Sequence, residues 1–410
     1  MTTENITDHT LPTTVDNKRR GRLRSVLSGL VLTFFSLVFS ILMIEIFVRV
    51  TFDSLPPALQ GDIQHVRRLP WKDERLVQPF PFVVDNKFQA RLEPGIKNYR
   101  IHWRDAQFTF STGTVWEGHV VGLRTNGPRW PLQILAFGDS FTFCWTEVND
   151  CWVQRLQNDY GWNSVNAGLA GTGSTGQLAL IEDIGPPLEP KLVIWQWYPN
   201  DLSDDYVLAN IQGKTDTLAG APGPDPVPDA EGLARYSAVY TLLKKWLDPP
   251  KSSSPYKHYV TREVNGRDML VATNEYPSPF SMTYPLVQYG WERDVEAHEA
   301  GADFIQQQVG AQMLLVVLPT KEEAYAEYLV DDLGEGYIQQ IGESRRMLLA
   351  MCEEKGWRCI DMLPIFQEAI HNGKTIYYAL DFHLDASGNQ LLAETLHDYI
   401  IENGLLDTSQ

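Results

Sequence analysis

Three side chains in this sequence are of the types needed for nucleophilic catalysis by serine. Ser140 follows the apolar run Ile134–Phe137, and His383 follows the carboxylate of Asp381 by two residues. A serine hydroxyl becomes a nucleophile when a base accepts its proton and a carboxylate orients that base. We therefore expect Ser140 to attack a carbonyl carbon, His383 to take and return the proton, and Asp381 to orient His383.

The sequence also supplies donors for the oxyanion that such an attack creates. They are the backbone N–H groups of Ser140 and Gly171 and the side-chain amide of Asn200. The run Gly138-Asp139-Ser140 is, on its own, more typical of a polar turn that caps a helix, because Asp and Ser are both favoured N-caps. The prediction of a site depends on elements that bring these distant residues together.

Each of these residues follows a segment that the pattern predicts to be a buried strand or its loop. Continuous apolar runs between turn residues predict parallel strands at Ile134–Phe137, Asn163–Ala167, Lys191–Trp197, Gln312–Leu318 and Arg358–Met362. Helices are expected between them, at Trp152–Tyr160, Gln177–Ile184, Trp291–Val309, Ile338–Lys355 and Ser387–Asn403. This alternation predicts an α/β fold with a doubly wound parallel sheet, in which groups at the carboxyl ends of the strands meet at one edge.

Four short blocks resemble those of the SGNH hydrolases, also called GDSL-type esterases, and stand in that family's order. Gly138-Asp139-Ser140 resembles the nucleophile block, Asn166–Gly171 the block of the oxyanion glycine, Pro199-Asn200-Asp201 the block of the oxyanion asparagine, and Asp381-Phe382-His383 the acid–base block. The resemblance covers Ile134–Asn403. It implies a three-layer α/β/α, flavodoxin-like fold, hydrolysis or transfer of acyl groups at an ester, and no metal or cofactor.

The chain departs from the common family pattern in two blocks. One residue separates Asp381 from His383 where many members have two, and this spacing is similar to the branch that includes membrane-anchored enzymes of exopolysaccharide acetylation. Pro199 precedes Asn200 and removes a backbone donor beside it. The segment Pro319–Tyr325 also resembles a segment of that branch, and it is equally typical of a helix start with charged caps.

A basic cluster and a long apolar run lie near the amino terminus. Val26–Ile44 runs 19 residues without a charge, close to the roughly 20 that cross a bilayer as a helix. A cleaved signal peptide is the alternative, but its apolar core is usually only about 7 to 15 residues and ends in small residues. We expect a disordered cytoplasmic tail with the basic cluster at 1–25, a transmembrane signal anchor at 26–48, and a periplasmic or extracellular catalytic domain.

The remaining chain is expected to divide into three parts. Residues 53–131, with candidate β-hairpins, form a short β-rich lead-in segment. Residues 132–403 form the SGNH hydrolase domain, interrupted at about 203–285 by an insertion that is rich in Gly, Pro, Asp and Ser. Residues 404–410 form a tail. The role of the insertion stays open.

The four cysteines, Cys144, Cys151, Cys352 and Cys359, would lie in an oxidising compartment and are candidates for disulfides. Each sequence-adjacent pair is seven residues apart, about 10.5 Å on an unbroken helix and beyond the roughly 7 Å Cα limit of a disulfide. A helix break at 146–150 would permit Cys144–Cys151, and the turn at 355–357 would permit Cys352–Cys359. All three pairings stay open.

Composition excludes some partners. The formal charge of −18 would repel nucleic acid, and the histidines show no metal-ligand spacing. We therefore predict an SGNH-type serine esterase or O-acyltransferase, anchored in the membrane, whose substrate is an acyl ester, with an acetyl group on carbohydrate favoured. A lipase- or lysophospholipase-like esterase and a non-catalytic glycan-binding domain are the alternatives.

Overall fold

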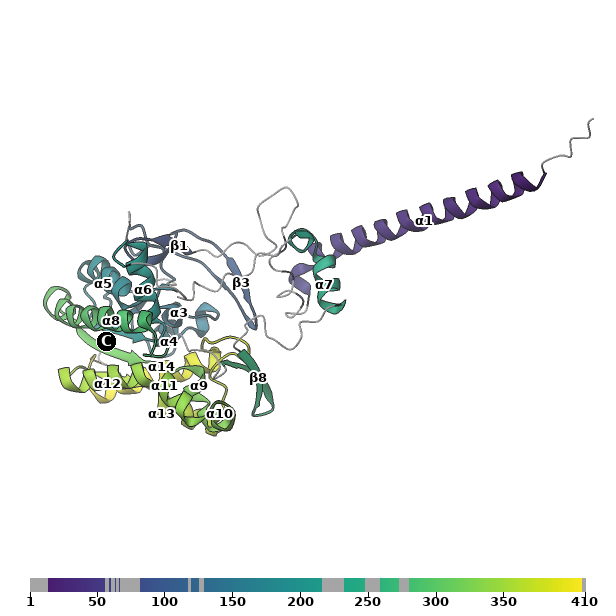
Figure 1. Cartoon of the computed structure of the whole chain (residues 1–410). Coiled ribbons are helices and arrows are strands. Elements are labelled where there is room, and N and C mark those ends of the chain that lie inside the picture. Colours follow the sequence, from purple (N-terminus) through teal and green to yellow (C-terminus); the bar gives the residue numbers. More distant parts are fainter. Residues whose placement is uncertain are drawn as a thin grey trace, which may run out of the picture.

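The computed structural model describes residues 14–55, 59, 63, 66, 82–116, 119–124, 129–215, 232–247, 259–272 and 280–407. Within these residues the protein has an α/β body and one long helix, α1 (Thr14–Val50), which runs away from that body (Figure 1). The functional candidates all lie in the α/β body, so the sheet at its centre decides how they are arranged.

Five parallel strands form this sheet. They are β5 (Ile134–Phe137), β6 (Ser164–Asn166), β7 (Leu192–Trp197), β10 (Gln312–Val317) and β11 (Cys359–Asp361). Their order is β11-β10-β7-β5-β6, and every neighbouring pair is parallel. Counted along the chain this is the flavodoxin-like order 2-1-3-4-5, in which the connections reverse direction between the first and third strands, here β5 and β7. The predicted fold class is confirmed.

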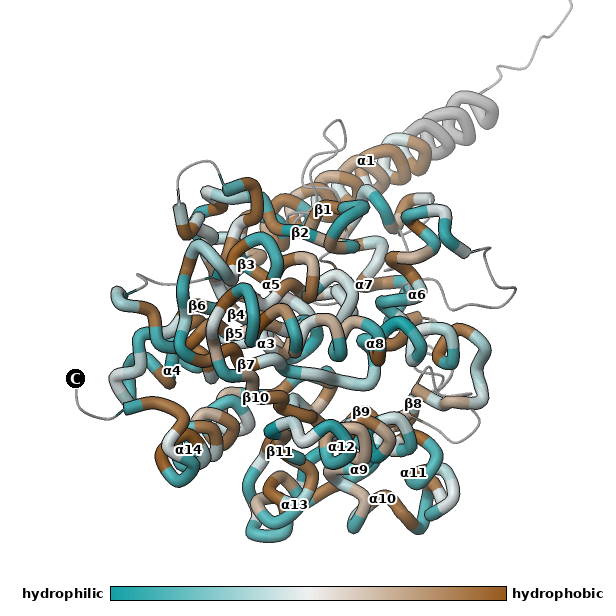
Figure 2. Tube along the Cα trace, turned by 90° about the vertical axis from the view of Figure 1, so that its left-hand side faces the viewer, coloured by the Kyte–Doolittle hydropathy of each residue, from teal (hydrophilic) through white to brown (hydrophobic). Residues whose placement is uncertain are grey.

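Helices cover both faces of the sheet. Alternate strand residues, such as Leu135 and Phe137, belong to one hydrophobic core with α5 (Ser174–Leu188), α8 (Pro285–Phe304) and α12 (Glu343–Lys355). The intervening residues, such as Ile134 and Ala136, pack in a second core with α4 (Trp152–Asn158), α13 (Leu363–His371) and α14 (Ala386–Glu402). Figure 2 shows the hydrophobic strands between helices of mixed hydropathy. This is the expected three-layer α/β/α arrangement.

Smaller elements complete the described chain. The further helices are α3 (Ser140–Phe143), α6 (Asp201–Ile211), α7 (Ala238–Leu247), α9 (Lys321–Ala324), α10 (Ala326–Leu333) and α11 (Glu335–Ile341). Short 3-10 helices lie at Phe52–Ser54, Val148–Asp150 and Gly232–Arg235, and a π-helix lies at Ile305–Val309. Antiparallel hairpins are formed by β1 (Phe82–Asp85) with β2 (Gln89–Leu92), β3 (Tyr99–Trp103) with β4 (Ala106–Phe110), and β8 (Tyr259–Val264) with β9 (Arg267–Ala272).

The first residues of the insertion expected at about 203–285 belong to a helix of the α/β body. Residues 201–211 form α6, which packs against α8 in the body. The acidic residues of this stretch concealed the helix, because Asp201 and Asp205 are themselves buried and accept hydrogen bonds. Parts of the expected insertion, at 216–231, 248–258 and 273–279, lie outside the described residues.

The two ends of the chain also differ from the expectation. Helix α1 begins at Thr14, so it includes part of the tail expected at 1–25, and residues 1–13 lie outside the described residues. Its basic residues are good helix formers, and no proline interrupts them. At the other end, Leu405 and Leu406 are buried in the second core, so part of the segment expected as a tail at 404–410 belongs to the packed body.

Candidate active site

A tight turn brings Ser140 to the carboxyl end of β5. Gly138 lies at φ +151°, and a Cβ there would stand 2.3 Å from Thr142 Oγ1, so only glycine fits. Asp139 is the N-cap of α3, and its Oδ1 accepts the Phe141 N–H at 2.9 Å. The helix-cap interpretation of the Gly-Asp-Ser run is therefore correct for Asp139. Ser140, the first residue of α3, lines a cavity.

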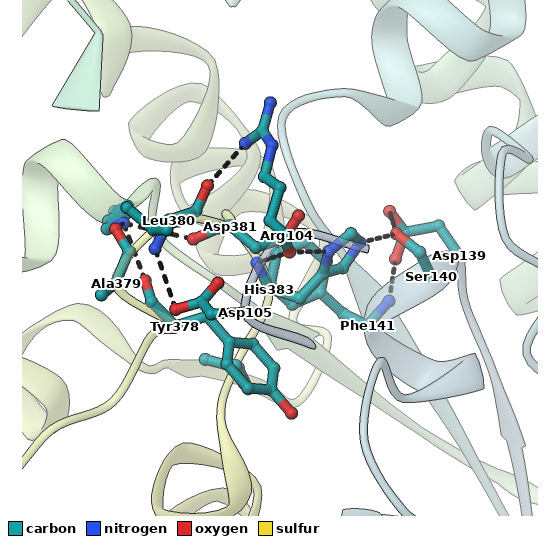
Figure 3. A network of polar contacts seen from close by, with 12 residues as sticks. Arg104, Asp105, Asp139, Ser140, Phe141, Tyr378, Ala379, Leu380, Asp381 and His383 are labelled. Carbon is teal, nitrogen blue, oxygen red and sulfur yellow. Dashed lines mark hydrogen bonds and ion pairs between the residues drawn. The ribbon is translucent and has the colours of Figure 1, made fainter. Parts of the chain in front are cut away.

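The structure brings Ser140, His383 and Asp381 into one hydrogen-bonded chain (Figure 3). The distance from His383 Nε2 to Ser140 Oγ is 2.8 Å, and His383 Nδ1 lies 2.5 Å from Asp381 Oδ1. Burial alone would raise the pKa of Asp381, but the positive charge and hydrogen bonds of His383, with the charge of Arg104, lower that pKa to about 2. Asp381 is thus a carboxylate at neutral pH, as the orienting role requires.

A buried ammonium group holds the loop that carries Asp381 and His383. Lys321 Nζ donates to the carbonyl oxygens of Tyr378 and Ala379 at 2.8 Å each and to that of Asp381 at 3.2 Å. Lys321 is buried, and the loss of water lowers its pKa to about 8. It opens α9, in the Pro319–Tyr325 segment for which the sequence left two interpretations open. The helix start is real, since Thr320 forms a capping box there.

The β-rich lead-in segment contacts the loops on both sides of the site. Arg104 and Asp105, in the turn between β3 and β4, bond to the two backbone polar groups of Leu380 at 2.7 and 3.0 Å (Figure 3). Arg124 is buried and donates to the Phe143 carbonyl oxygen at 2.9 Å, and also to those of Cys144 and Thr146. The lead-in segment therefore positions both the loop after Ser140 and the loop that carries Asp381 and His383. The sequence did not predict this role for the lead-in segment.

Two disulfides lie in the described chain. Cys144 and Cys151, with Cα atoms 5.4 Å apart, close the loop between α3 and α4. Cys352 and Cys359, with Cα atoms 6.2 Å apart, join α12 to β11. Neither pair has the helical spacing that would exclude it, because Cys144 and Cys151 flank a loop between two helices, and the chain leaves α12 between Cys352 and Cys359. The first bridge closes the loop that leads away from Ser140.

The three expected oxyanion donors line the same cavity as His383. Gly171 lies at φ +73°, a conformation that favours glycine, in the loop between β6 and α5. Asn200 follows β7, lines the cavity and donates a side-chain N–H to Asp204 Oδ2 at 2.9 Å. The structure thus brings together every residue proposed for catalysis.

Asp204 is a site residue that the sequence analysis placed in the insertion. It comes from α6, and its other carboxylate oxygen accepts a hydrogen bond from Gln89 at 2.8 Å. Burial raises the pKa of Asp204 to about 7. Its carboxyl group fixes the orientation of the Asn200 amide. One feature of the sequence could have indicated this contact. Asp204 follows Asn200 by four residues, so the two side chains would lie on the same face of a helix.

The cavity has a volume of about 370 Å³, within the range of small-molecule sites. Aromatic residues make up a large part of its walls, and Trp145 stacks on the His383 ring at a centroid distance of 4.8 Å. Other aromatic residues of the wall are Phe141, Tyr198, Tyr259, Phe280, Tyr337 and Phe382. Such a pocket accommodates a small acyl group and part of its alcohol.

Replacing Asn200 with alanine is expected to lower kcat by about a hundredfold to a thousandfold, the usual cost of one oxyanion donor. The protein should stay folded, because Asn200 is at the surface of the cavity and not in the sheet. Steady-state kinetics on an activated acetyl ester measures this effect, and Asn210→Ala, at the far end of α6, is a matched control. An Asn200→Ala protein with unchanged kcat would remove Asn200 from the oxyanion site.

Replacing Lys321 with methionine is expected to lower kcat by about a hundredfold, because small displacements of catalytic groups have costs of this order. In the wild type, activity should also fall as pH rises through about 8, the pKa to which burial lowers Lys321, since a neutral amine has too few N–H groups for three carbonyls. The pH–rate profile should lose this alkaline limb in Lys321→Met. An alkaline limb that persists unchanged in the variant would contradict the assignment, and Lys374→Met on the surface is the control.

Comparison with known proteins identifies the domain type of the C-terminal part. Residues 299–410 match the family model described as "SGNH hydrolase-like domain, acetyltransferase AlgX". This segment contains Asp381 and His383. The match confirms the resemblance to SGNH hydrolases and the enzyme class, an esterase or acyltransferase. No curated protein matches the chain in sequence.

Several solved structures are similar to this chain at low identity. One is a member of the lipolytic G-D-S-L family from Veillonella parvula, with 12% identity, 66% of this chain and 98% of that chain covered, and a TM-score of 0.36. Another is an acetylxylan esterase from Geobacillus stearothermophilus, with 12% identity, coverage of 68% and 96%, and a TM-score of 0.36. A third is an arylesterase from Agrobacterium tumefaciens, with 14% identity, coverage of 66% and 99%, and a TM-score of 0.35.

Proposed function

The C-terminal part of this chain is an SGNH hydrolase-like domain. On this basis we propose that the chain is a membrane-anchored, extracytoplasmic serine enzyme that removes or transfers acetyl groups at esters of carbohydrate. The observation that carries the proposal is the hydrogen-bonded chain from Ser140 through His383 to Asp381 at the wall of the cavity. A domain that only binds glycans has no use for this arrangement, which supports catalysis over the binding alternative.

The reaction follows from these positions. Ser140 Oγ attacks the ester carbonyl carbon while His383 Nε2 takes the hydroxyl proton, and the oxyanion accepts hydrogen bonds from Ser140 N–H, Gly171 N–H and Asn200. The C–O bond to the alcohol then breaks, and His383 gives its proton to the departing oxygen. The acetyl group is left on Ser140.

The second half of the reaction decides between hydrolysis and transfer. His383 takes a proton from water or from a hydroxyl group of an acceptor, whose oxygen attacks the acetyl carbonyl carbon. The bond from that carbon to Ser140 Oγ then breaks, and His383 returns the proton to Ser140 Oγ. Tyr198, Phe280 and Phe382 give the cavity flat apolar faces next to polar groups, which suits the alternating CH and OH surfaces of a sugar ring. These features support carbohydrate as the alcohol component.

Membrane anchoring is supported by the apolar segment Ser25–Val50 of α1, which is 26 residues long and almost entirely exposed in the monomer. A helix of this length and composition suits a bilayer better than water. The basic residues before this segment favour a cytoplasmic amino terminus, and so support a catalytic domain on the other side of the membrane.

Product analysis on the purified full chain tests the proposal. An activated acetyl ester should release acetate, and an added acceptor polysaccharide should divert acetyl groups from water to sugar if the enzyme is a transferase. The parallel reaction with an octanoyl ester should be slower, because the cavity of about 370 Å³ is small for a long chain. Faster turnover of octanoyl than of acetyl esters would favour the lipase-like alternative, and no turnover of any ester would overturn the proposal.

A further inference from the structure

One helix in the region of the expected insertion packs against α1. Helix α7 (Ala238–Leu247) lies beside the end of α1 that joins the rest of the chain (Figure 1). Glu45 of α1 accepts hydrogen bonds from the backbone N–H groups of Ala238 and Val239, at 2.9 Å each, and from Ser237 Oγ at 2.8 Å. Glu45 therefore caps the amino-terminal end of α7 from another helix.

A second set of contacts fixes the direction of α7. Arg49 pairs with Glu45 at 2.6 Å and donates to the Tyr236 carbonyl oxygen at 2.5 Å. On the other side, Ala238 packs in a small hydrophobic cluster with Val48 and Phe52 of the α1 region. Because charge-assisted bonds and apolar packing act together, α7 holds a defined orientation relative to α1.

The remaining face of α7 is apolar and exposed. Leu243 is 46% exposed, Trp246 77% and Leu247 71%. Lys244 and Lys245 lie in the last turn of the same helix and are exposed as well. Helices that lie in a membrane interface combine Leu and Trp with Lys in this way. Their apolar side chains point toward the acyl chains, and their amines lie at the headgroups.

The length of α1 places α7 at the level of that interface. At 1.5 Å per residue, the uncharged run from Val26 to Ile44 covers about 28 Å, close to the roughly 30 Å of a hydrocarbon core. Glu45 and Arg49 come directly after this run, where charged side chains meet the headgroups. Since Glu45 and Arg49 bind α7, this helix lies at the same depth.

We propose that α7 is an interfacial helix that lies on the outer surface of the membrane that α1 crosses, with Leu243, Trp246 and Leu247 inserted among the lipids. It acts as a second attachment to the membrane beside the anchor. This rests on the membrane anchoring of the proposed function, and it gives the insertion a role.

Site-directed fluorescence on the full chain in vesicles of phosphatidylcholine and phosphatidylglycerol tests this proposal. A single cysteine is added by Trp246→Cys and labelled with an environment-sensitive dye, since the four natural cysteines form disulfides. Phe35→Cys in α1 and Gln390→Cys on α14 are the matched positions inside the bilayer and in water. We expect headgroup nitroxide lipids to quench the dye at 246, deeper nitroxides to quench it at 35, and neither to quench it at 390.

The outcomes separate the two proposals. If a water-soluble quencher quenches the dye at 246 as strongly as the dye at 390, the proposal of an interfacial helix is overturned. It is also overturned if neither lipid nor water-soluble quenchers reach the dye at 246, because that result would indicate a protein partner. Lipid quenching at 35 in either case leaves the anchor intact, whereas its loss removes the anchor and the interfacial helix together. Adding Glu45→Gln should weaken quenching at 246 but not at 35, because it removes the carboxylate that caps α7.

Discussion

Replacing Ser140 with alanine is expected to abolish both esterase activity and labelling by a fluorophosphonate. Loss of a catalytic serine typically lowers kcat by on the order of a millionfold, so the variant should show only the background that its oxyanion donors provide. The hydroxyl of Ser140 bonds to His383 at 2.8 Å and makes a longer contact of 3.5 Å with Asp139. Both belong to the site and not to the core, so the variant should fold.

Circular dichroism and the melting temperature check that Ser140→Ala is folded. Ser111→Ala, on an exposed residue of the lead-in segment, is the matched control and should keep full activity. Full probe labelling and full turnover in Ser140→Ala would show that another residue is the nucleophile.

Replacing Asp381 with asparagine should lower kcat by about ten thousandfold while the fold persists. The carboxylate accepts a hydrogen bond from His383 Nδ1, so the proton-free nitrogen of the ring faces Ser140. An asparagine amide can present an N–H to Nδ1 instead and favours the tautomer with its proton on Nε2, which cannot accept the serine proton. Steady-state kinetics at neutral pH measures this loss, and kcat within tenfold of the wild type would contradict the role of Asp381.

The same variant makes a prediction about acid stability. The pKa of Asp381 in the folded state, about 2, is lower than its ordinary value of 3.8. The ionised group therefore stabilises the fold above pH 3.8, and this contribution is lost as pH falls toward 2. The free energy of unfolding should decrease less steeply over this range in Asp381→Asn than in the wild type. Equal slopes in urea titrations would show that Asp381 is not held as an anion.

Local sequence patterns were sufficient to predict the sheet and the group of residues that the structure brings together around Ser140. The strands at Ile134–Phe137 and Leu192–Trp197 are continuous apolar runs because both of their faces are buried. The order of turns after them then places Ser140 and Asn200 at one edge. The chemical types of these side chains, together with the resemblance of four blocks to SGNH hydrolases, were the basis for predicting their catalytic roles.

The supporting contacts could not be predicted in the same way, because they join segments that are far apart in the sequence. Lys321 contacts carbonyls 57 to 60 residues away, and Arg104 contacts one that is 276 residues away. A buried lysine or a buried acidic helix such as α6 looks like solvent-exposed sequence until its partners are known. The long-range partners, and not the local pattern, explain why these charged residues are buried.

The central claim is that an acyl group passes through Ser140, and mass spectrometry of the trapped intermediate tests it most directly. The full chain is mixed with an activated acetyl ester, quenched in acid within the first turnover, and digested. We predict one acetyl group on the peptide that contains Ser140, and none on that peptide in Ser140→Ala. Sustained turnover with no acetyl group on Ser140, or with the acetyl group on another residue, would contradict the account.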